Sequence, residues 1–512
     1  MAAAIDQAAH FTPRRAGLAV TCTALAVGAL ALNRQLVGVF YDDGLYAGIA
    51  VALAQGMGYV HPHLPGAPAA VHYPPLWPVL LAPLFAMFPL DTAALLGKIL
   101  NLLLAAAGAG LIAWHAARTR LLGDDAPSWL APVLVGAAAI TIPVLAIQAV
   151  LFSEPLFGVL LVAAVILTDA PPPRLHAGVA AGLAGCAAAL ALLTRSIGVA
   201  AGAGVVLYLL VVRRAPWAHL AAAAAPVALA GLGWGLWLAR HRGGLDPAMA
   251  MNYGGYFETV QAAGVGVFWP SLRDLPRPLG DLTLNWLPAP FFYYAFGAAA
   301  LGVGAYGVGH LLRRTAIAWM LVPYLAILAV WPFPGDRFIW SILAWLALIW
   351  TAGALALVRR WRLLRLPLAV LVGVMLVGWG GVQVRGFAHR WWGTAGSRVS
   401  ENFRELLPAL QSLPPNAVLA TDDEALVWLY TRRTSVPFYV YTYRGRTSVR
   451  PTPAEHRAYL ERQRVTHILM GGFGSGSDEE LDALLGAYPG WLKVVRVWRG
   501  GRALFEVQQR VS

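Results

Sequence analysis

The chain has 512 residues, of which 59% are apolar and only 12% are charged, and its mean hydropathy is +0.62. A soluble chain carries about a quarter charged residues, so this composition excludes a soluble protein and predicts a polytopic membrane protein. Arginine supplies nearly all of the net charge of +13, and the two cysteines, Cys22 and Cys186, lie in apolar runs, so we expect neither a disulfide framework nor a thiolate metal site.

Apolar stretches long enough to cross a bilayer recur from the N-terminus to about residue 384. Eleven spans are predicted, at 16–39, 93–116, 128–150, 154–169, 175–193, 197–212, 217–239, 290–311, 315–331, 338–358 and 366–384. The first span resembles a signal sequence, with two arginines before an apolar run. We expect it to remain uncleaved because ten further spans follow it.

The arginines of the short connections predict the orientation of these spans. They fall on alternate connections, near residues 14–15, 118–120, 174, 213–214, 313–314 and 359–365. This side is cytoplasmic by the positive-inside rule, and arginines dispersed in this way do not form a nucleic-acid-binding stripe. We therefore expect a multi-pass protein of the cell (inner) membrane with a cytoplasmic N-terminus and extracytoplasmic segments at 40–92, 240–289 and after about 385.

The apolar segment 76–90 decides this topology. It contains Pro78, Pro83 and Pro89 and is short for a span. Counting it as a span would turn Arg118, Arg120 and the later connection arginines outward. We interpret it as a re-entrant or interfacial segment.

Adjacent carboxylates follow the first span, in the motif YDDGLY at 41–46. One of them, Asp42, can cap a helix over 45–54, because an aspartate at a helix N-terminus satisfies free backbone donors. Two carboxylates leave a second one that can act as a general base or hold a cation. Both interpretations of Asp42 and Asp43 stay open.

Three more polar sites lie at outer ends of spans, where ionisable groups often mark function. Glu154 stands between two spans, where Ser153-Glu154-Pro155 is also typical of an ordinary helix start. Arg195 lies against the topological trend and needs a partner, either a carboxylate such as Glu154 or a phosphate. Arg337 follows Asp336 in a tight turn, where a local ion pair is the alternative.

The first outer loop also holds three histidines, His61, His63 and His72. They form a weak candidate metal site, because their spacing matches no known closed pattern of ligands. Tyr73, before two prolines, shapes the chain where the loop re-enters lipid, although tyrosine there also fits an interfacial aromatic belt.

From residue 416 the sequence alternates strand-like and helix-like pieces. These predict strands at 417–420, 435–440, 466–470, 494–497 and 503–507 and helices at 423–430, 453–464 and 478–488. The pattern indicates a small α/β domain with a mainly parallel sheet. The glycine-rich run 471–476 lacks the spacing of a nucleotide fingerprint and predicts a surface loop. The acidic run 422–424 fits a helix cap or a contact with the acceptor.

The order of these motifs resembles the GT-C membrane glycosyltransferases of the protein-mannosyltransferase and aminoarabinose-transferase type. The likeness rests on DDGLYA at 42–47, YPPL at 73–76, SEPLF at 153–157, LTR at 193–195 and DRF at 336–338. It covers most of the membrane part. Two departures are Tyr73, where the aminoarabinose branch has lysine, and the C-terminal α/β domain, where protein mannosyltransferases have a β-rich domain.

The resemblance implies a glycosyltransferase that takes a sugar from a polyprenyl-phosphate carrier and places it, with inversion, on a glycan, lipid or protein acceptor outside the cytoplasm. It implies that Asp42 is the base and that Asp43 and Glu154 are further acidic groups of catalysis. It implies that Arg195 and Arg337 bind the lipid phosphate, with Tyr46, His72 and Tyr73 beside the substrate. It names no certain cofactor and leaves a divalent cation open.

The sequence thus predicts an α-helical polytopic protein of the GT-C type, with a transmembrane glycosyltransferase domain at 1–390 and an extracytoplasmic α/β domain at 391–512. A transporter or flippase for lipid-linked sugars and a non-catalytic membrane scaffold are the alternatives. The conspicuous charges cluster on one face and no internal repeat is present, which favours chemistry at the membrane surface over translocation.

Overall fold

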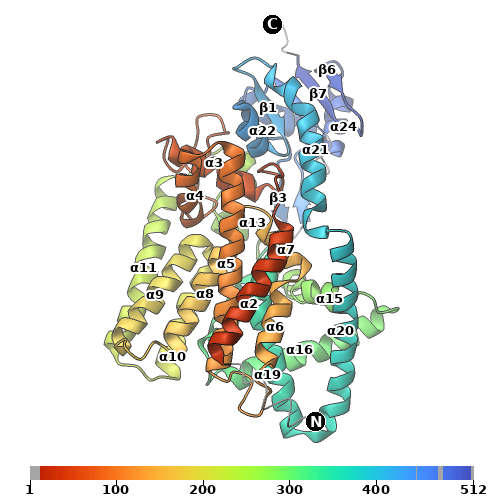
Figure 1. Cartoon of the computed structure of the whole chain (residues 1–512). Coiled ribbons are helices and arrows are strands. Elements are labelled where there is room, and N and C mark those ends of the chain that lie inside the picture. The colour runs from red at the N-terminus through yellow and green to blue at the C-terminus, as the bar shows by residue number, and fades with distance from the viewer. Residues whose placement is uncertain (1–11, 445–446, 471–476, 509–512) are drawn as a thin grey trace. The chain divides into compact units, whose positions relative to one another are not determined.

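A computed structural model describes residues 12–444, 447–470 and 477–508 (Figure 1). The glycine-rich run 471–476 lies outside these residues. Contacts divide the chain into two compact units. Unit 1 comprises residues 1–32, 98–235 and 268–392, and unit 2 comprises residues 33–97, 236–267 and 393–512.

Unit 1 is built from helices. They are α2 (Pro13–Gly28), most of α5 (Leu90–Arg118), α6 (Leu130–Ala139), α7 (Ile142–Gln148), α8 (Glu154–Asp169), α9 (Ala177–Thr194), α10 (Val199–Val211), most of α11 (Trp217–Arg240), α14 (Phe268–Asp274), α15 (Arg277–Thr283), α16 (Pro290–Leu311), α17 (Ala316–Ala329), α18 (Asp336–Ser341), α19 (Leu343–Arg360) and α20 (Arg365–Ala388).

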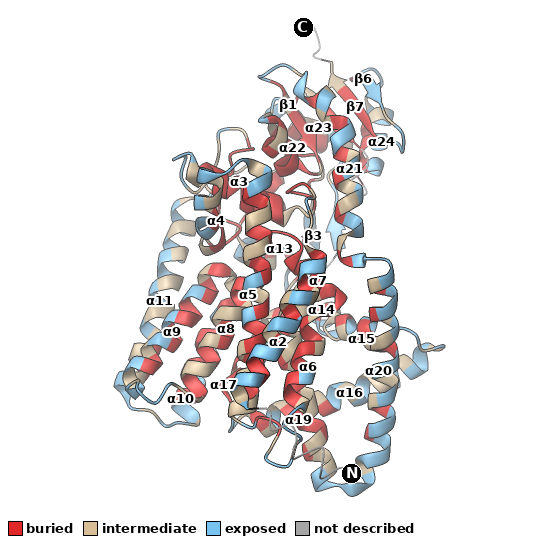
Figure 2. Cartoon of the chain, viewed as in Figure 1, coloured by how far each residue is buried: buried red, intermediate tan, exposed pale blue. Residues whose placement is uncertain are grey.

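The core of unit 1 is formed largely by alanine and branched apolar side chains of α5, α8, α9, α10, α17 and α19. Helices α8, α9 and α10 pack side by side (Figure 1). Between α16 and α19 the backbones approach closely at Gly307 and Gly353, where a Cβ atom would collide with the facing helix. Helices α11 and α20 are mostly exposed although they are apolar (Figure 2), which is typical of helices that face lipid.

Each predicted span contains a helix, and two predicted spans are shorter or broken. The helix of the first span ends at Ala31, because Asn33 accepts a hydrogen bond from the backbone of Gln35 and turns the chain. The predicted span 128–150 is two helices, α6 and α7, bent by 58° where Pro143 starts α7. The first predicted span therefore ends earlier than residue 39, and the predicted span 128–150 is bent in its middle.

Among the described residues, seven helices are long and apolar enough to cross a membrane, or eight if α6 and α7 form one span. Helices α8, α10 and α17, of 16, 13 and 14 residues, are shorter, so the count of eleven spans stays a prediction. Helix α4 (Leu76–Met87) has 12 residues. Since an α-helix rises about 1.5 Å per residue, α4 reaches only about 18 Å, well short of a bilayer core of about 30 Å.

Unit 2 contains the predicted outer loop and the C-terminal α/β segment. Its helices are α3 (Asp42–Ala54), α4, α12 (Ala250–Tyr253), α13 (Tyr256–Ala263), most of α21 (Trp391–Gln411), α22 (Glu424–Thr431), α23 (Pro453–Arg462) and α24 (Asp478–Ala487). Its strands are β1 (Val418–Thr421), β2 (Thr434–Pro437), β3 (Thr442–Arg444), β4 (Thr447–Val449), β5 (His467–Met470), β6 (Leu492–Val497) and β7 (Ala503–Val507).

The sheet of unit 2 corrects one expectation. Its strand order is β2-β1-β5-β7-β6, and β1 pairs in parallel with β2 and β5. Strand β7 then inserts antiparallel between β5 and β6. The predicted α/β pattern at the C-terminal end is present, but its sheet is mixed rather than mainly parallel, because the last strand returns as a hairpin instead of through a crossover helix.

Candidate functional site

The first carboxylate of the outer loop, Asp42, begins α3 directly after a strained turn. Tyr41 has φ 61° and ψ −71°, and the backbone N–H of Asp42 donates to the carbonyl of Phe40 at 2.7 Å. This three-residue hydrogen bond defines a γ-turn, which is rare for a residue other than glycine. The turn gives the half-buried Asp42 side chain a fixed place at the helix start.

The second carboxylate, Asp43, is fully buried. Its two oxygens accept hydrogen bonds from the backbone N–H groups of Gly38 and Phe40, each at 2.9 Å. Asp43 therefore ties the chain before α3 to the helix, and this burial does not fit the expectation that it faces a substrate. Helix capping by Asp42 is also revised, since the N-cap residue is Tyr41 and makes no side-chain capping hydrogen bond.

Three residues predicted beside the substrate lie around Asp42. The Tyr73 hydroxyl donates to Oδ1 of Asp42 at 2.6 Å, and the rings of Tyr46 and Tyr73 lie 4.7 Å apart. His72 also packs on Tyr73, at 4.6 Å between ring centres, and its Nδ1 donates to the carbonyl of Gly254 at 2.8 Å. The structure therefore brings Asp42, Tyr46, His72 and Tyr73 together, as expected.

His72 is held as a neutral group. Burial lowers the pKa of its imidazole, although the carbonyl of Gly254 and the charge of Asp42 raise it. Because Nδ1 carries the proton that it donates, Nε2 is left as an acceptor. Beside Asp42, a neutral imidazole can orient a hydroxyl group but adds no positive charge.

The histidines do not assemble as a metal site. The rings of His61 and His63 lie 5.6 Å apart and both are buried, whereas His72 bonds to a backbone carbonyl. Across the described ranges, no group of three or more His, Cys, Asp or Glu side chains is placed to hold a metal ion. Burial lowers the pKa of His63 to about 3, so this side chain is uncharged near neutral pH.

A buried polar chain joins the outer loop to the C-terminal segment within unit 2. Nε2 of His63 lies 2.9 Å from the hydroxyl of Tyr253, and that hydroxyl donates to Oε1 of Glu424 in the first turn of α22. Burial raises the pKa of Glu424 to about 8. The predicted helix cap at 422–424 is wrong, since the N-cap Asp423 makes no capping hydrogen bond and Glu424 turns inward instead.

In unit 1, Glu154 bonds to both predicted arginines. Its Oε1 lies 3.0 Å from Nη1 of Arg195 and accepts from Nε of Arg337 at 2.7 Å, which confirms the carboxylate alternative for Arg195. Phenyl rings cover the guanidiniums. The Cζ atom of Arg337 lies 3.5 Å from the centre of the Phe152 ring, and the Cζ atom of Arg195 lies 4.5 Å from the centre of the Phe338 ring. Two guanidiniums and one carboxylate leave one net positive charge in this cluster.

The alternative of a local pair between Asp336 and Arg337 is wrong. Asp336 pairs with Arg277 at 3.0 Å, and Arg337 turns to Glu154. The Glu154 carboxylate is 1% exposed, whereas the Arg337 side chain is 27% exposed. The geometry therefore favours Glu154 as the counter-ion that holds the two arginines and leaves Arg337 accessible to an anion.

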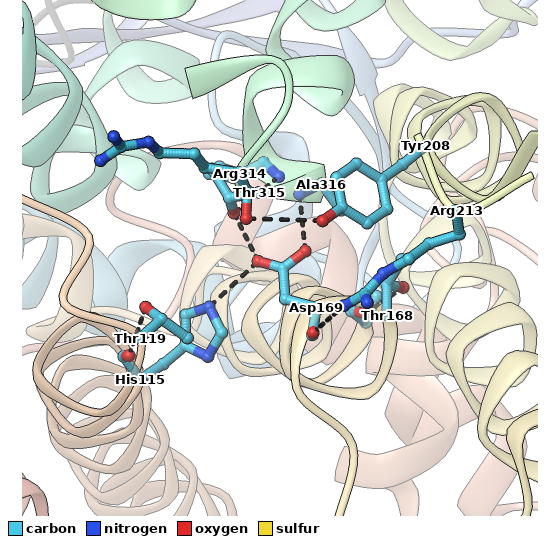
Figure 3. A network of polar contacts seen from close by, with 11 residues as sticks. His115, Thr119, Thr168, Asp169, Tyr208, Arg213, Arg314, Thr315 and Ala316 are labelled. Atoms are coloured by element: carbon cyan, nitrogen blue, oxygen red, sulfur yellow. Dashed lines mark hydrogen bonds and ion pairs between the residues drawn. The ribbon is translucent and has the colours of Figure 1, made fainter. Parts of the chain in front are cut away.

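A second buried carboxylate of unit 1, Asp169, belongs to a network that the sequence analysis missed (Figure 3). Its oxygens accept from the backbone N–H of Ala316 at 2.7 Å, from the hydroxyl of Thr315 and from Nε2 of His115 at 3.1 Å. Arg213 donates to the backbone carbonyl of Asp169. Asp169 thus ends α8 and caps α17. The only sign of this network in the sequence is the position of Asp169 at the end of the predicted span 154–169.

Comparison with solved structures extends this description. No family model matches the chain, and no curated protein matches it in sequence. The crystal structure of ArnT from Cupriavidus metallidurans bound to undecaprenyl phosphate is similar over 95% of this chain and 97% of that chain, with a TM-score of 0.50 and 17% identity.

Two structures of the archaeal oligosaccharyltransferase of Archaeoglobus fulgidus are also similar. The apo form has a TM-score of 0.49 and 11% identity, over 98% of this chain and 75% of that chain. The complex of AglB with an inhibitory peptide and a dolichol-phosphate has a TM-score of 0.48 and 12% identity, over 89% and 69%. The likeness to ArnT confirms the expected fold, largely helical with a small α/β segment at the C-terminal end.

Proposed function

We propose that this protein is a membrane glycosyltransferase that moves a sugar from a polyprenyl-phosphate carrier to an acceptor on the extracytoplasmic side. The observation that carries the proposal is Asp42, a half-buried carboxylate set at the start of α3 by a strained turn and by Tyr73, in a chain with the fold of ArnT. The ArnT crystal structure holds undecaprenyl phosphate, which supports a lipid-borne donor here.

The proposed reaction is a single displacement at the anomeric carbon. Asp42 takes the proton of the acceptor hydroxyl as the acceptor oxygen bonds to that carbon, and the bond from the carbon to the phosphate oxygen breaks. The electron pair of the broken bond leaves with the polyprenyl phosphate. No enzyme nucleophile takes part, so the configuration of the sugar inverts.

Tyr73 supports the base in this scheme. Its hydroxyl donates to Oδ1 of Asp42, which fixes the rotation of the carboxylate. Asp43 holds the backbone before α3, so in this proposal it positions Asp42 and does not touch the reacting atoms. Tyr46 packs on the ring of Tyr73 and keeps it in place.

Arg195 and Arg337 are the proposed binders of the phosphate. Guanidinium groups match the geometry of phosphate oxygens, and positive charge stabilises the leaving group as its own charge grows. Glu154 uses Oε1 for both arginines, so it orients them and leaves one net positive charge in the cluster. No step of the scheme requires a metal ion, and the choice of sugar and acceptor stays open.

The test is turnover of a panel of radiolabelled polyprenyl-phosphate sugars by membranes that contain the wild-type chain, Asp42→Asn or Asp91→Asn. Asp91 is the matched control, because it is also a carboxylate in the first turn of an apolar helix but is exposed. We expect the wild type and Asp91→Asn to use one donor, and Asp42→Asn to lose about 10²–10⁴-fold in rate. Equal turnover by Asp42→Asn would remove the proposed base.

A further inference from the structure

The turn before Asp42 is strained and needs contacts with neighbouring residues to persist. A non-glycine residue with the φ of Tyr41 costs about 1–3 kcal/mol and persists only where the surroundings fix it. The hydrogen bonds from Gly38 and Phe40 to Asp43 close the turn on one side. The remaining contacts of the turn therefore determine whether Asp42 keeps its position.

Helix α22 of the C-terminal segment packs directly against this turn. Gly38, with φ +100°, leaves no room for a side chain, because a Cβ atom there would lie 2.9 Å from the Cα of Leu426. A Cβ atom on Gly44, in the first turn of α3, would lie 3.1 Å from the Cβ of Ala425. Two consecutive residues of α22 thus meet the chain on both sides of Asp42.

Glu424, the residue before them in α22, is linked to the same turn through Tyr253. Tyr253 donates its hydroxyl to Glu424, and the ring of Tyr253 lies 6.4 Å from the ring of Tyr41. The ring of the strained residue therefore lies beside the tyrosine whose hydroxyl is bonded to Glu424.

We propose that Glu424 and Tyr253 are positioning residues, which hold the Tyr41 turn and through it set the Asp42 carboxylate for the reaction proposed above. The C-terminal segment then takes part in transfer without touching the substrate. This inference rests on the proposed function, since it takes Asp42 as the base and explains how α22 and α12 hold the turn that places it. His63 completes the support by bonding to Tyr253.

The experiment compares Tyr253→Phe and Glu424→Leu with the control Tyr459→Phe in the full chain. Tyr459 is as buried as Tyr253, and its hydroxyl donates to the carbonyl of Pro437 at 2.9 Å in the same unit. All three variants lose one buried hydrogen bond, but only two of them act on the Tyr41 turn. Melting temperature in detergent is measured for each.

We expect kcat to fall about a hundredfold in Tyr253→Phe and Glu424→Leu, since misplacement of a reacting group by about 1 Å has this effect. The KM for the lipid donor should stay within about twofold, because the ground-state binding of the donor does not use these residues. Tyr459→Phe should keep its kcat. If Tyr253→Phe does not fold, Glu424→Leu decides alone, because it removes the same hydrogen bond from the acceptor side.

Hydrogen exchange of residues 36–48 gives a readout that needs no activity. Faster exchange in Tyr253→Phe and Glu424→Leu, with unchanged exchange in Tyr459→Phe, is expected. Normal kcat and unchanged exchange in the first two variants would overturn the positioning role while leaving the glycosyltransferase intact. Faster exchange in a protein that turns over no donor would instead keep the support of the turn and count against the proposed function.

Discussion

Two aspartates at helix ends, Asp169 in unit 1 and Asp42 in unit 2, show how the surroundings of a carboxylate indicate its role. Asp169 is 7% exposed and its oxygens accept three hydrogen bonds from two helices and a threonine (Figure 3). Asp42 is half-buried, and a tyrosine donates to one of its oxygens. The first is built to hold helices together, and the second retains access for a proton.

The largest expected effect is on stability, and it comes from Asp169. Asp169→Ala leaves His115, Thr315 and the backbone N–H of Ala316 buried without their acceptor. Breaking such a buried arrangement costs about 3–5 kcal/mol, so the melting temperature should fall steeply. Turnover per folded molecule should stay near the wild-type value.

The control for this variant is Asp124→Ala, since Asp124 is 83% exposed and forms a surface pair with Arg120. Its effect on unfolding should lie within about 0.5 kcal/mol. If Asp169→Ala were as stable as Asp124→Ala, the structural role of the Asp169 network would be wrong.

The next effect is on the rate, through Tyr73. Tyr73→Phe removes a hydrogen bond to the Asp42 carboxylate, and hydrogen bonds to charged groups contribute about 1.5–3 kcal/mol. We expect kcat to fall roughly ten- to a hundredfold. Steady-state kinetics of the two proteins measure this, and an unchanged kcat would mean that Asp42 does not need its tyrosine.

Glu154→Gln separates a counter-ion from an acid–base catalyst. Glutamine keeps an oxygen acceptor for Arg195 and Arg337 but removes the charge, so we expect a loss of roughly 1–2 kcal/mol in stability. If Glu154 is only a counter-ion, kcat should change by less than about tenfold. Loss of turnover in a folded variant would instead restore the catalytic role implied by the family resemblance.

A further effect is the pH dependence of the stability of unit 2. Burial raises the folded-state pKa of Glu424 from 4.5 to about 8, so the folded protein holds this proton more tightly than the unfolded chain. The stabilisation is complete below about pH 4.5 and is lost as the pH rises to about 8, by at most about 1.4 kcal/mol per pH unit. Melting temperatures at pH 5 to 9 should therefore fall more for the wild type than for Glu424→Gln, and equal slopes would contradict this pKa.

Local patterns in the sequence were sufficient for much of this account. Hydropathy located the helical segments, and span 154–169 coincides with α8. A carboxylate partner for Arg195 could be predicted because an unpaired charge at the membrane is energetically costly. The grouping of Asp42, Tyr46, His72 and Tyr73 could also be predicted, because all four lie in one loop and are therefore close in sequence.

What sequence reasoning missed depends on contacts between distant segments. His115 and Asp169 are separated by 54 residues, and Tyr253 and Glu424 by 171. No periodicity or spacing signals such pairs, because helix packing decides them. The mixed sheet was missed for the same reason, since the place of β7 between β5 and β6 is a matter of long-range register.

The central claim is inverting transfer from a lipid phosphate with Asp42 as the base. The most direct measurement uses purified wild-type and Asp42→Asn protein in lipid nanodiscs with the polyprenyl-phosphate sugar that the panel identifies. Released polyprenyl phosphate and the anomeric configuration of the product are followed together by NMR. The account predicts one carrier released per sugar transferred, an inverted anomeric centre and loss of both signals in Asp42→Asn, whereas retention of configuration or undiminished transfer by Asp42→Asn would contradict it.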